Sequence, residues 1–250
     1  TYGDRRHAAA DTGEELADVI RRTVERGGTV LVPSFAVGRA QALLYLVHRL
    51  KADGRIAWNL PVYLNSPMAT DVTGLYQQYR SELRLTREQT QAMCTAAKFV
   101  NSVEESKALN EGSWPRVIIA ASGMATGGRV LHHLRALASD ARNTVLFSGY
   151  QAAGTRGRAM VDGAKEIKIF GEYVPVRAEI AMLDSLSAHA DSAELVDWMR
   201  GIPKAPAMTF VTHGEPVAAD AMRLHIGESL KWRCTVPEYL ERAELEVAGR

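Results

Sequence analysis

The feature that most constrains the fold is a recurring order of helix, strand and Gly-containing loop. Short apolar runs that can form buried strands lie at residues 29–32, 61–65, 116–121 and 143–147. Helical patterns are expected from Thr12 to the Gly27-Gly28 pair, and over 40–51, 66–79 and 130–138. Strands that alternate with helices form a parallel sheet covered on both faces. The sequence therefore predicts an α/β, Rossmann-like fold.

The start of the first helix is also readable. Thr12 is expected to be its N-cap, with Glu15 at the spacing of a capping box. Residues 81–115 are polar and helical in character, and helix starts are expected near Thr86 and Glu104.

After about Gly163 the pattern changes. Residues 165–170 and 174–181 alternate as paired or meandering strands do, with no helix between them. We therefore expect a domain boundary at 172–176, which divides the chain into domains of residues 1–174 and 175–250.

Two short polar turns beyond this boundary each contain a histidine. His189 lies beside Asp191 and His213 beside Glu215, and each turn joins an apolar run to a helical pattern. We expect the two imidazoles at neighbouring strand ends, each near a carboxylate that orients it or shares a proton. A lone histidine in a loop is usually no more than a polar residue, but two in matching contexts favour a functional site.

Three loops that follow strands combine Gly with Arg. They cover residues 34–39, 122–129 and 149–158. Gly allows a ligand close to the backbone, a helix start offers N–H donors, and Arg binds phosphate. A phosphate-binding crevice at one sheet edge is predicted; the alternative is that these arginines are solvated charges at helix starts. His132 and His133 are adjacent on a helix, so they cannot face one metal, and we expect surface or supporting roles.

Composition excludes several classes of protein. The formal net charge of +1 gives no general attraction to nucleic acid, so an anion site must be local. Cys94 and Cys234 belong to no CxxC pattern, which fits a reducing cytoplasm. The sequence has no apolar run of membrane-spanning length and no signal-peptide pattern, so we expect no membrane partner. The chain begins at Thr1 within a polar motif, which we interpret as part of a longer protein.

The motifs resemble those of the β-CASP branch of the metallo-β-lactamase superfamily, the RNA-processing nucleases similar to RNase J and to the endonuclease subunit of the cleavage and polyadenylation factor. They are Thr1-Tyr2-Gly3-Asp4-Arg5, Pro33-Ser34-Phe35-Ala36-Val37-Gly38-Arg39, Ala121-Ser122-Gly123-Met124, Gly127-Gly128-Arg129, Gly149-Tyr150-Gln151, Gly154-Thr155-Arg156-Gly157-Arg158, Ser187-Ala188-His189-Ala190-Asp191 and Thr212-His213-Gly214-Glu215. The resemblance implies a β-CASP domain followed by the C-terminal returning segment of a metallo-β-lactamase αββα fold. It also implies hydrolysis of RNA, which we expect to be single-stranded, in a crevice beside two zinc ions.

The resemblance also suggests residue roles. His213 is similar to a late zinc ligand, and His189 to a general acid, with Asp191 as its catalytic partner. The expected RNA phosphate-binding residues are Ser34, Arg39, Ser122, Gly127, Gly128, Arg129, Gly154, Thr155 and Arg158.

One part of the family pattern is missing from this sequence. The HxHxDH cluster, the next His and the bridging Asp of the family do not occur among residues 1–250. A single imidazole cannot hold zinc, because such sites need about four donors. We therefore expect the chain to be the C-terminal part of a nuclease, inactive and free of zinc without its N-terminal metallo-β-lactamase half.

Two other functions stay open. The chain could be a non-catalytic RNA-binding or scaffolding module, although a scaffold has no chemical need for His189, Asp191, His213 and Glu215. A hydrolase of small substrates is disfavoured by the arginine-lined loops. DNA as substrate, a homo-oligomeric state and endo- or exonucleolytic cleavage are not decided by the sequence.

Overall fold

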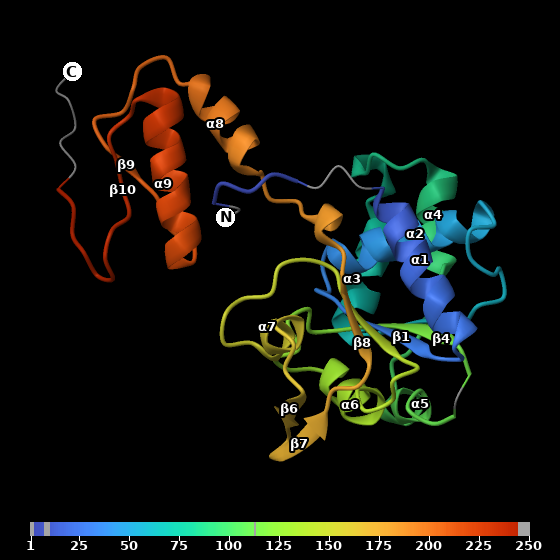
Figure 1. The fold of residues 1–250 in the computed structure, drawn as a ribbon. Coiled ribbons are helices and arrows are strands. Elements are labelled where there is room, and N and C mark those ends of the chain that lie inside the picture. Colours follow the sequence, from blue (N-terminus) through green and yellow to red (C-terminus); the bar gives the residue numbers. More distant parts are fainter. Residues whose placement is uncertain (1–2, 8–10, 113, 245–250) are drawn as a thin grey trace. The chain divides into compact units, whose positions relative to one another are not determined.

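The computed structural model describes residues 3–7, 11–112 and 114–244, which belong to two compact units (Figure 1). We call Ala9–Leu186 the sheet unit, and Thr1–Ala8 together with Ser187–Arg250 the histidine unit. The units divide between residues 186 and 187, whereas the division of family domains at 174 and 175 stays a prediction.

The sheet unit is built on a six-stranded sheet in the order β3-β2-β4-β1-β5-β8. All of its pairings are parallel, which confirms the predicted fold class. The strands are β1 (Thr29–Pro33), β2 (Val62–Asn65), β3 (Lys98–Phe99), β4 (Arg116–Ala120), β5 (Thr144–Phe147) and β8 (Glu179–Met182). β3, a strand of two residues, was not predicted.

Helices cover both faces of this sheet. They are α1 (Thr12–Glu25), α2 (Arg39–Ala52), α3 (Pro67–Gln78), α4 (Arg87–Thr95), α5 (Val103–Ala108), α6 (Val130–Leu137) and α7 (Arg156–Val161). Val117 and Ile119 of β4 pack in the apolar cluster with α1, α2 and α4, whereas Ile118 packs in the cluster with α6 and α7. Because neighbouring residues of a strand point to opposite faces, each central strand contributes to both clusters.

The first helix begins one residue earlier than predicted. Asp11, not Thr12, is its N-cap, and the Asp11 carboxylate accepts hydrogen bonds from the backbone N–H groups of Gly13 and Glu14. A carboxylate at this place stabilises the exposed donors and the helix dipole, so the expected Thr12 cap is wrong. The Thr86 start is confirmed, because Thr86 and Gln89 form a capping box.

The strand pattern after Gly163 contains two different arrangements. β6 (Glu166–Ile169) and β7 (Glu172–Pro175) form an antiparallel hairpin. Paired strands were predicted here because the sequence has no helical pattern between the two runs. β8 instead adds to the edge of the main sheet beside β5. A 3₁₀ turn, Asp184–Leu186, then ends the sheet unit.

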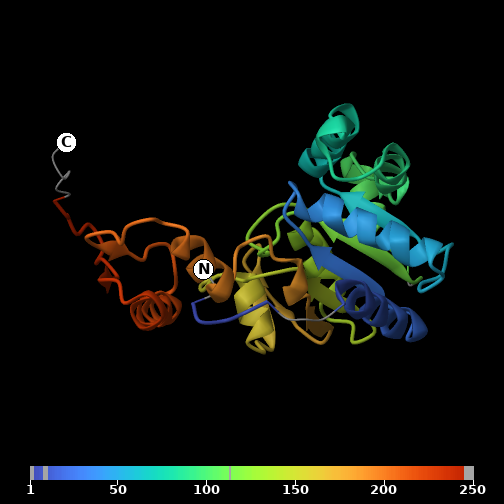
Figure 2. The ribbon, with the colours of Figure 1, turned by 90° about the horizontal axis from the view of Figure 1, so that it is seen from above.

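The histidine unit consists of α8 (Ser192–Arg200), β9 (Thr209–Phe210), α9 (Pro216–Leu230) and β10 (Cys234–Thr235). β9 and β10 pair in parallel, and Val196 of α8 packs with Met222 and Ile226 of α9. The two helices are orange and red in Figure 2. The expectation of neighbouring strand ends was wrong, since β8 belongs to the main sheet and β9 to this separate pair. No described helix is long and apolar enough to cross a membrane.

Candidate nucleic-acid interface and histidine turns

The three Gly- and Arg-containing loops leave the same edge of the sheet. They follow β1, β4 and β5, which lie side by side as β4-β1-β5 and run parallel. The carboxyl ends of parallel strands share one edge, where α/β proteins bind their ligands. The predicted common edge is therefore confirmed.

Direct contacts join these loops to one another. The Gly157 N–H donates to the Met124 carbonyl at 3.1 Å, and the Gln151 side-chain amide donates to the Gly123 carbonyl at 3.2 Å. A Cβ on Gly123 would lie 2.7 Å from the Phe35 ring, which is too close for any other residue. The three loops thus form one interlocked surface.

Ser122 and Gly128 shape the middle loop. The Ser122 hydroxyl oxygen accepts from the backbone N–H groups of Thr126 and Gly127, each at 3.3 Å. Gly128 has a φ of 75°, and a Cβ there would lie 2.5 Å from the Ala121 carbonyl oxygen. Gly127 has open space around the position of a Cβ. Ser122 and Gly128 therefore fix the loop from within, while Gly127 leaves room beside its backbone.

The other predicted phosphate-binding residues lie in the first and third loops. The Ser34 side chain is buried, and its hydroxyl donates to the Phe35 carbonyl. Thr155 caps α7 by accepting from the Arg158 N–H, and the Arg158 guanidinium pairs with Asp162 at 2.9 Å. Gly154 has a φ of 79°, which permits the turn into this helix.

Two of the arginines reach beyond their own loops. The Arg39 guanidinium approaches within 3.5 Å of the place where a Gly149 side chain would begin, so it spans the first and third loops. Arg129 donates from Nη1 to Asn65 Oδ1 at 2.7 Å and to the Val100 carbonyl at 2.9 Å. Its Nη2 donates to the Asn101 carbonyl at 2.5 Å. Arg129 thus connects the middle loop to the end of β2 and to the segment that follows β3.

The loop edge also carries aromatic side chains that the sequence analysis did not single out. Phe35 is 50% exposed and Tyr150 is 46% exposed, one from the first loop and one from the third. Exposed aromatic rings beside arginines are the arrangement on which unpaired bases stack. The signal in the sequence was a large aromatic residue in a Gly-containing loop, two or three residues after a strand, where burial is not expected.

His133 is fully buried, so of the two expected roles it takes the supporting one. Asn65 Nδ2 donates to His133 Nε2 at 2.7 Å, and His133 Nδ1 donates to Asn110 Oδ1 at 2.6 Å. Burial, followed by the charges of His132, Arg116 and Arg129, lowers the pKa of His133 to about 4. The ring is therefore neutral, as its two hydrogen bonds require. His132 is exposed, as expected.

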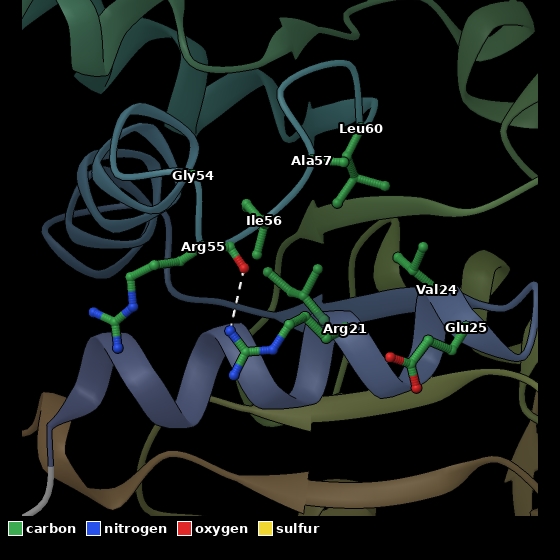
Figure 3. Close-up of a pocket in the computed structure, with 9 residues that line it drawn as sticks. Arg21, Val24, Glu25, Gly54, Arg55, Ile56, Ala57 and Leu60 are labelled. Carbon is green, nitrogen blue, oxygen red and sulfur yellow. Dashed lines mark hydrogen bonds between the residues drawn. The ribbon is translucent and has the colours of Figure 1, made fainter.

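A cavity elsewhere in the sheet unit lies beside α1 (Figure 3). It measures about 250 Å³ and is lined mainly by apolar groups, among them Ile20, Ile56 and Leu60. Arg21 spans it and donates to the Arg55 carbonyl at 3.2 Å. Arg55 in turn forms an ion pair with Glu14, so both arginines support the packing of α1. This cavity holds no predicted site residue.

In the histidine unit, Asp191 organises the turn that carries His189. The Asp191 carboxylate caps α8 by accepting from the N–H groups of Ala193 and Glu194 at 2.9 and 3.0 Å. Its second oxygen accepts from the His7 N–H at 2.9 Å. These backbone donors, that of Glu194 first and that of His7 next, lower the pKa of Asp191, which keeps the carboxylate ionised.

The segment from Gly3 to His7 is packed against both histidine-bearing helix starts. Ser192 donates from its hydroxyl to the Asp4 carbonyl and from its N–H to the Arg5 carbonyl, both at 3.1 Å. The His7 ring bonds through Nε2 to the His189 carbonyl at 2.8 Å. A Cβ on Gly3 would lie 3.0 Å from Ala218 in the first turn of α9. The sequence analysis treated this segment only as a family motif and missed its structural role.

His213 adopts an uncommon backbone conformation. Its φ is 62°, in the left-handed region that few residues other than glycine occupy. Holding a side-chain-bearing residue there costs about 1–2 kcal/mol. The His213 side chain is exposed at the start of α9, next to Glu215, the N-cap residue of this helix.

The described residues do not assemble a zinc site around His213. Among them, the one group of three close metal-ligand side chains is His7, Asp191 and Glu194. Asp191 is already occupied by three backbone donors, and Glu194 accepts from the Asp191 N–H at 2.9 Å. This group is a helix-capping arrangement. A two-zinc centre therefore needs further donors besides His213.

Two protein-family models match parts of this chain. Residues 40–160 match the Beta-Casp domain, and residues 173–237 match the Zn-dependent metallo-hydrolase RNA specificity domain. The chain belongs to the β-CASP family. The matches cover the second and third loops and both histidine turns, whereas the first loop, residues 34–39, lies just before the Beta-Casp match.

Individual β-CASP relatives include nucleases and a termination factor. Ribonuclease TTHA0252 from Thermus thermophilus is 39% identical over 86% of this chain and 50% of the relative. An RNase J-like protein from Methanocaldococcus jannaschii is 32% identical over 95% of this chain and 56% of the relative. Transcription termination factor FttA from Methanosarcina mazei is 32% identical over 98% of this chain and 40% of the relative. The chain thus spans about half the length of these relatives.

Proposed function

We propose that this chain is the RNA-binding and proton-donating part of a zinc-dependent ribonuclease. The observation that carries the proposal is the family match together with both histidine turns, His189 and His213. The ribonuclease among the relatives supports RNA phosphodiesters as the substrate.

The interlocked loops supply what a single RNA strand requires. Arg39 offers guanidinium donors for phosphate oxygens, the open space beside Gly127 lets a phosphate approach the backbone, and Phe35 and Tyr150 offer faces for bases. Because the net charge is only +1, attraction to RNA depends on this local group of loops.

His189 is assigned as the general acid of the reaction. Its exposed side chain stands on a turn fixed by Asp191 and by the His7 ring, which leaves the imidazole itself available for proton transfer. In this role it delivers a proton to the leaving oxygen as the phosphodiester bond breaks. Asp191 acts by positioning this turn, since its oxygens are bound to backbone N–H groups.

His213 is assigned as one zinc ligand of a centre whose other donors lie outside this chain. Zinc, when bound, activates water and stabilises charge on the phosphate oxygens. The free thiols of Cys94 and Cys234 fit work in a reducing cytoplasm.

The alternative function is a non-catalytic RNA-binding module, which the termination factors among the relatives keep open. It predicts that substitution of His189 and His213 leaves function unchanged. The nuclease assignment predicts the opposite.

The decisive experiment uses the longer protein that contains this chain. His189→Ala should keep zinc and RNA affinity but lower turnover by roughly 10²–10⁴-fold, as expected for loss of a general acid. His213→Ala should lose zinc and activity together, measured by metal analysis and by cleavage of labelled RNA. If His189→Ala instead removes the zinc and His213→Ala leaves it in place, the two roles are reversed; if neither changes cleavage, the chain is a binding module.

RNA binding is tested separately on this chain alone. Arg39→Ala should weaken single-stranded RNA of unrelated sequences and make the dependence of log affinity on log salt shallower by about 0.7, the value for one lost phosphate contact. Arg87→Ala, at an exposed site on α4, is the control. Equal salt dependence in the two variants would show that Arg39 does not contact an RNA phosphate. The same purified chain should hold far less than one zinc.

A further inference from the structure

A second cavity of the sheet unit lies between α5 and α6. It measures about 440 Å³, within the range of small-ligand sites. Its polar and charged lining consists of Ser106, Lys107, Asn110, Arg129, His132 and Arg135. No carboxylate is among the residues that line it. A cavity with three permanent cations and no anion favours a negatively charged ligand.

Beneath the cavity lies a buried polar network that orients its donors. Arg129 donates to Asn65 Oδ1, so the Asn65 amide must donate, and it does so to Ser106 Oγ at 2.7 Å and to His133 Nε2. His133 then donates to Asn110 Oδ1. Ser106 Oγ and Asn110 Oδ1 thus each accept a hydrogen bond from this buried network.

Two neutral side chains of this lining retain hydrogen-bond donors. The Ser106 hydroxyl hydrogen and the Asn110 Nδ2 group have no described acceptor. Lys107 is exposed and forms no described ion pair. Arg135 pairs with Glu172 at 2.7 Å, but both side chains are at least half exposed, and such a pair is weak. Unused donors that lie beside cations suit the oxygens of a phosphate group.

We propose that the cavity between α5 and α6 binds a phosphate group of a nucleotide ligand. Lys107, Arg129 and Arg135 supply the charge, and Ser106 and Asn110 supply neutral donors. Arg129 also ends the middle loop, so the cavity adjoins the loop edge through this residue. The phosphate can therefore belong either to an RNA strand or to a small nucleotide. The proposal does not depend on hydrolysis.

The test compares two doubly substituted chains that lose the same charge. Lys107→Gln with Arg135→Gln removes two cations of the cavity. Lys165→Gln with Arg87→Gln removes two exposed cations elsewhere in the sheet unit. A third variant, Ala136→Phe, fills the cavity at an exposed helix position without a change of charge.

Calorimetric titration with pyrophosphate is the first measurement. The cavity pair should weaken binding by about tenfold or more, because it removes two groups that form charge-assisted hydrogen bonds to the ligand. Ala136→Phe should weaken it as well, and the control pair should change it by less than about twofold. The proposal is overturned if the wild type does not bind pyrophosphate, or if the cavity and control pairs lose affinity equally.

Binding of single-stranded RNA and of AMP distinguishes the two sources. If the RNA strand occupies the cavity, RNA affinity falls in the cavity pair and pyrophosphate competes with RNA. If a small nucleotide occupies it, AMP affinity falls and RNA affinity stays that of the control pair. Either result upholds the phosphate site, and neither depends on whether His189 is a general acid.

Discussion

The two units differ in what holds them together. In the sheet unit, Leu31, Ile118 and Phe147 lie on central strands and are completely buried between helices. In the histidine unit, a small apolar cluster centred on Val196, Met222 and Ile226 is supplemented by hydrogen bonds from the Gly3–His7 segment. The larger unit is thus specified mainly by burial, and the smaller one to a greater extent by directional polar contacts.

The unit with the larger buried core is therefore not the unit that carries the proposed proton donor. The loops proposed to bind RNA stand on a buried parallel sheet, while the proposed proton donor stands on a turn fixed by a few hydrogen bonds. Functional groups are commonly carried by such low-stability segments. Three predictions test this difference between the two units.

The largest expected effect comes from a matched pair of isoleucines. Ile118→Ala should destabilise the sheet unit by about 2–5 kcal/mol, near the upper end because helices and neighbouring strands prevent collapse of the cavity. Ile226→Ala, in the smaller cluster, should fall near the lower end. Hydrogen exchange of peptides 116–120 and 216–230 measures each unit separately. Equal protection losses in both units for either substitution would show that they unfold as one.

A pH effect of similar size is expected in the sheet unit alone. The His133 pKa is about 4 in the folded chain and about 6.5 when unfolded, so the unfolded state binds the proton first as pH falls. The stability from neutral His133 is fully present above pH 6.5 and decreases toward pH 4, by about 3 kcal/mol.

Urea unfolding between these pH values measures this effect. His133→Gln should be less stable at neutral pH, because the Asn65 and Asn110 hydrogen bonds are disturbed, but its stability should vary less across the window. His132→Gln, next to it and exposed, is the control. A wild-type stability that is flat from pH 6.5 to pH 4 would contradict the neutral His133 assignment.

The smallest effect is expected at His7. His7→Ala removes one hydrogen bond to the His189 carbonyl, worth about 1 kcal/mol, so exchange of the amides at 187–192 should rise by roughly fivefold. In the longer protein, kcat should fall while KM stays unchanged, because the turn positions the proposed acid.

A conservative variant separates positioning from mere loss of a side chain. His7→Gln should restore much of the protection and of kcat, since its amide can donate to the same carbonyl. Arg6→Ala, at the exposed neighbouring position, should change neither. Normal exchange and kcat in His7→Ala would show that the backbone bond from His7 to Asp191 is sufficient.

The sequence by itself determined the parallel sheet, the loops after β1, β4 and β5, and the family. These features are local, because buried strands are apolar runs and Gly-rich loops are visible in one dimension. It also identified His189, Asp191 and His213 as candidate residues, although their roles stay predictions.

Only the tertiary structure decided which partners these residues have. The bonds of His7 to His189 and Asp191 join residues 182 and 184 positions apart, and His133 is buried through Asn65 and Asn110, far from it along the chain. A histidine at an exposed helix position and one in a polar core look alike in sequence, because burial and hydrogen-bond partners depend on elements brought together only by folding. For the same reason the donor-lined cavity between α5 and α6 cannot be predicted from the sequence, because it forms only where folding packs the two helices on one face of the sheet.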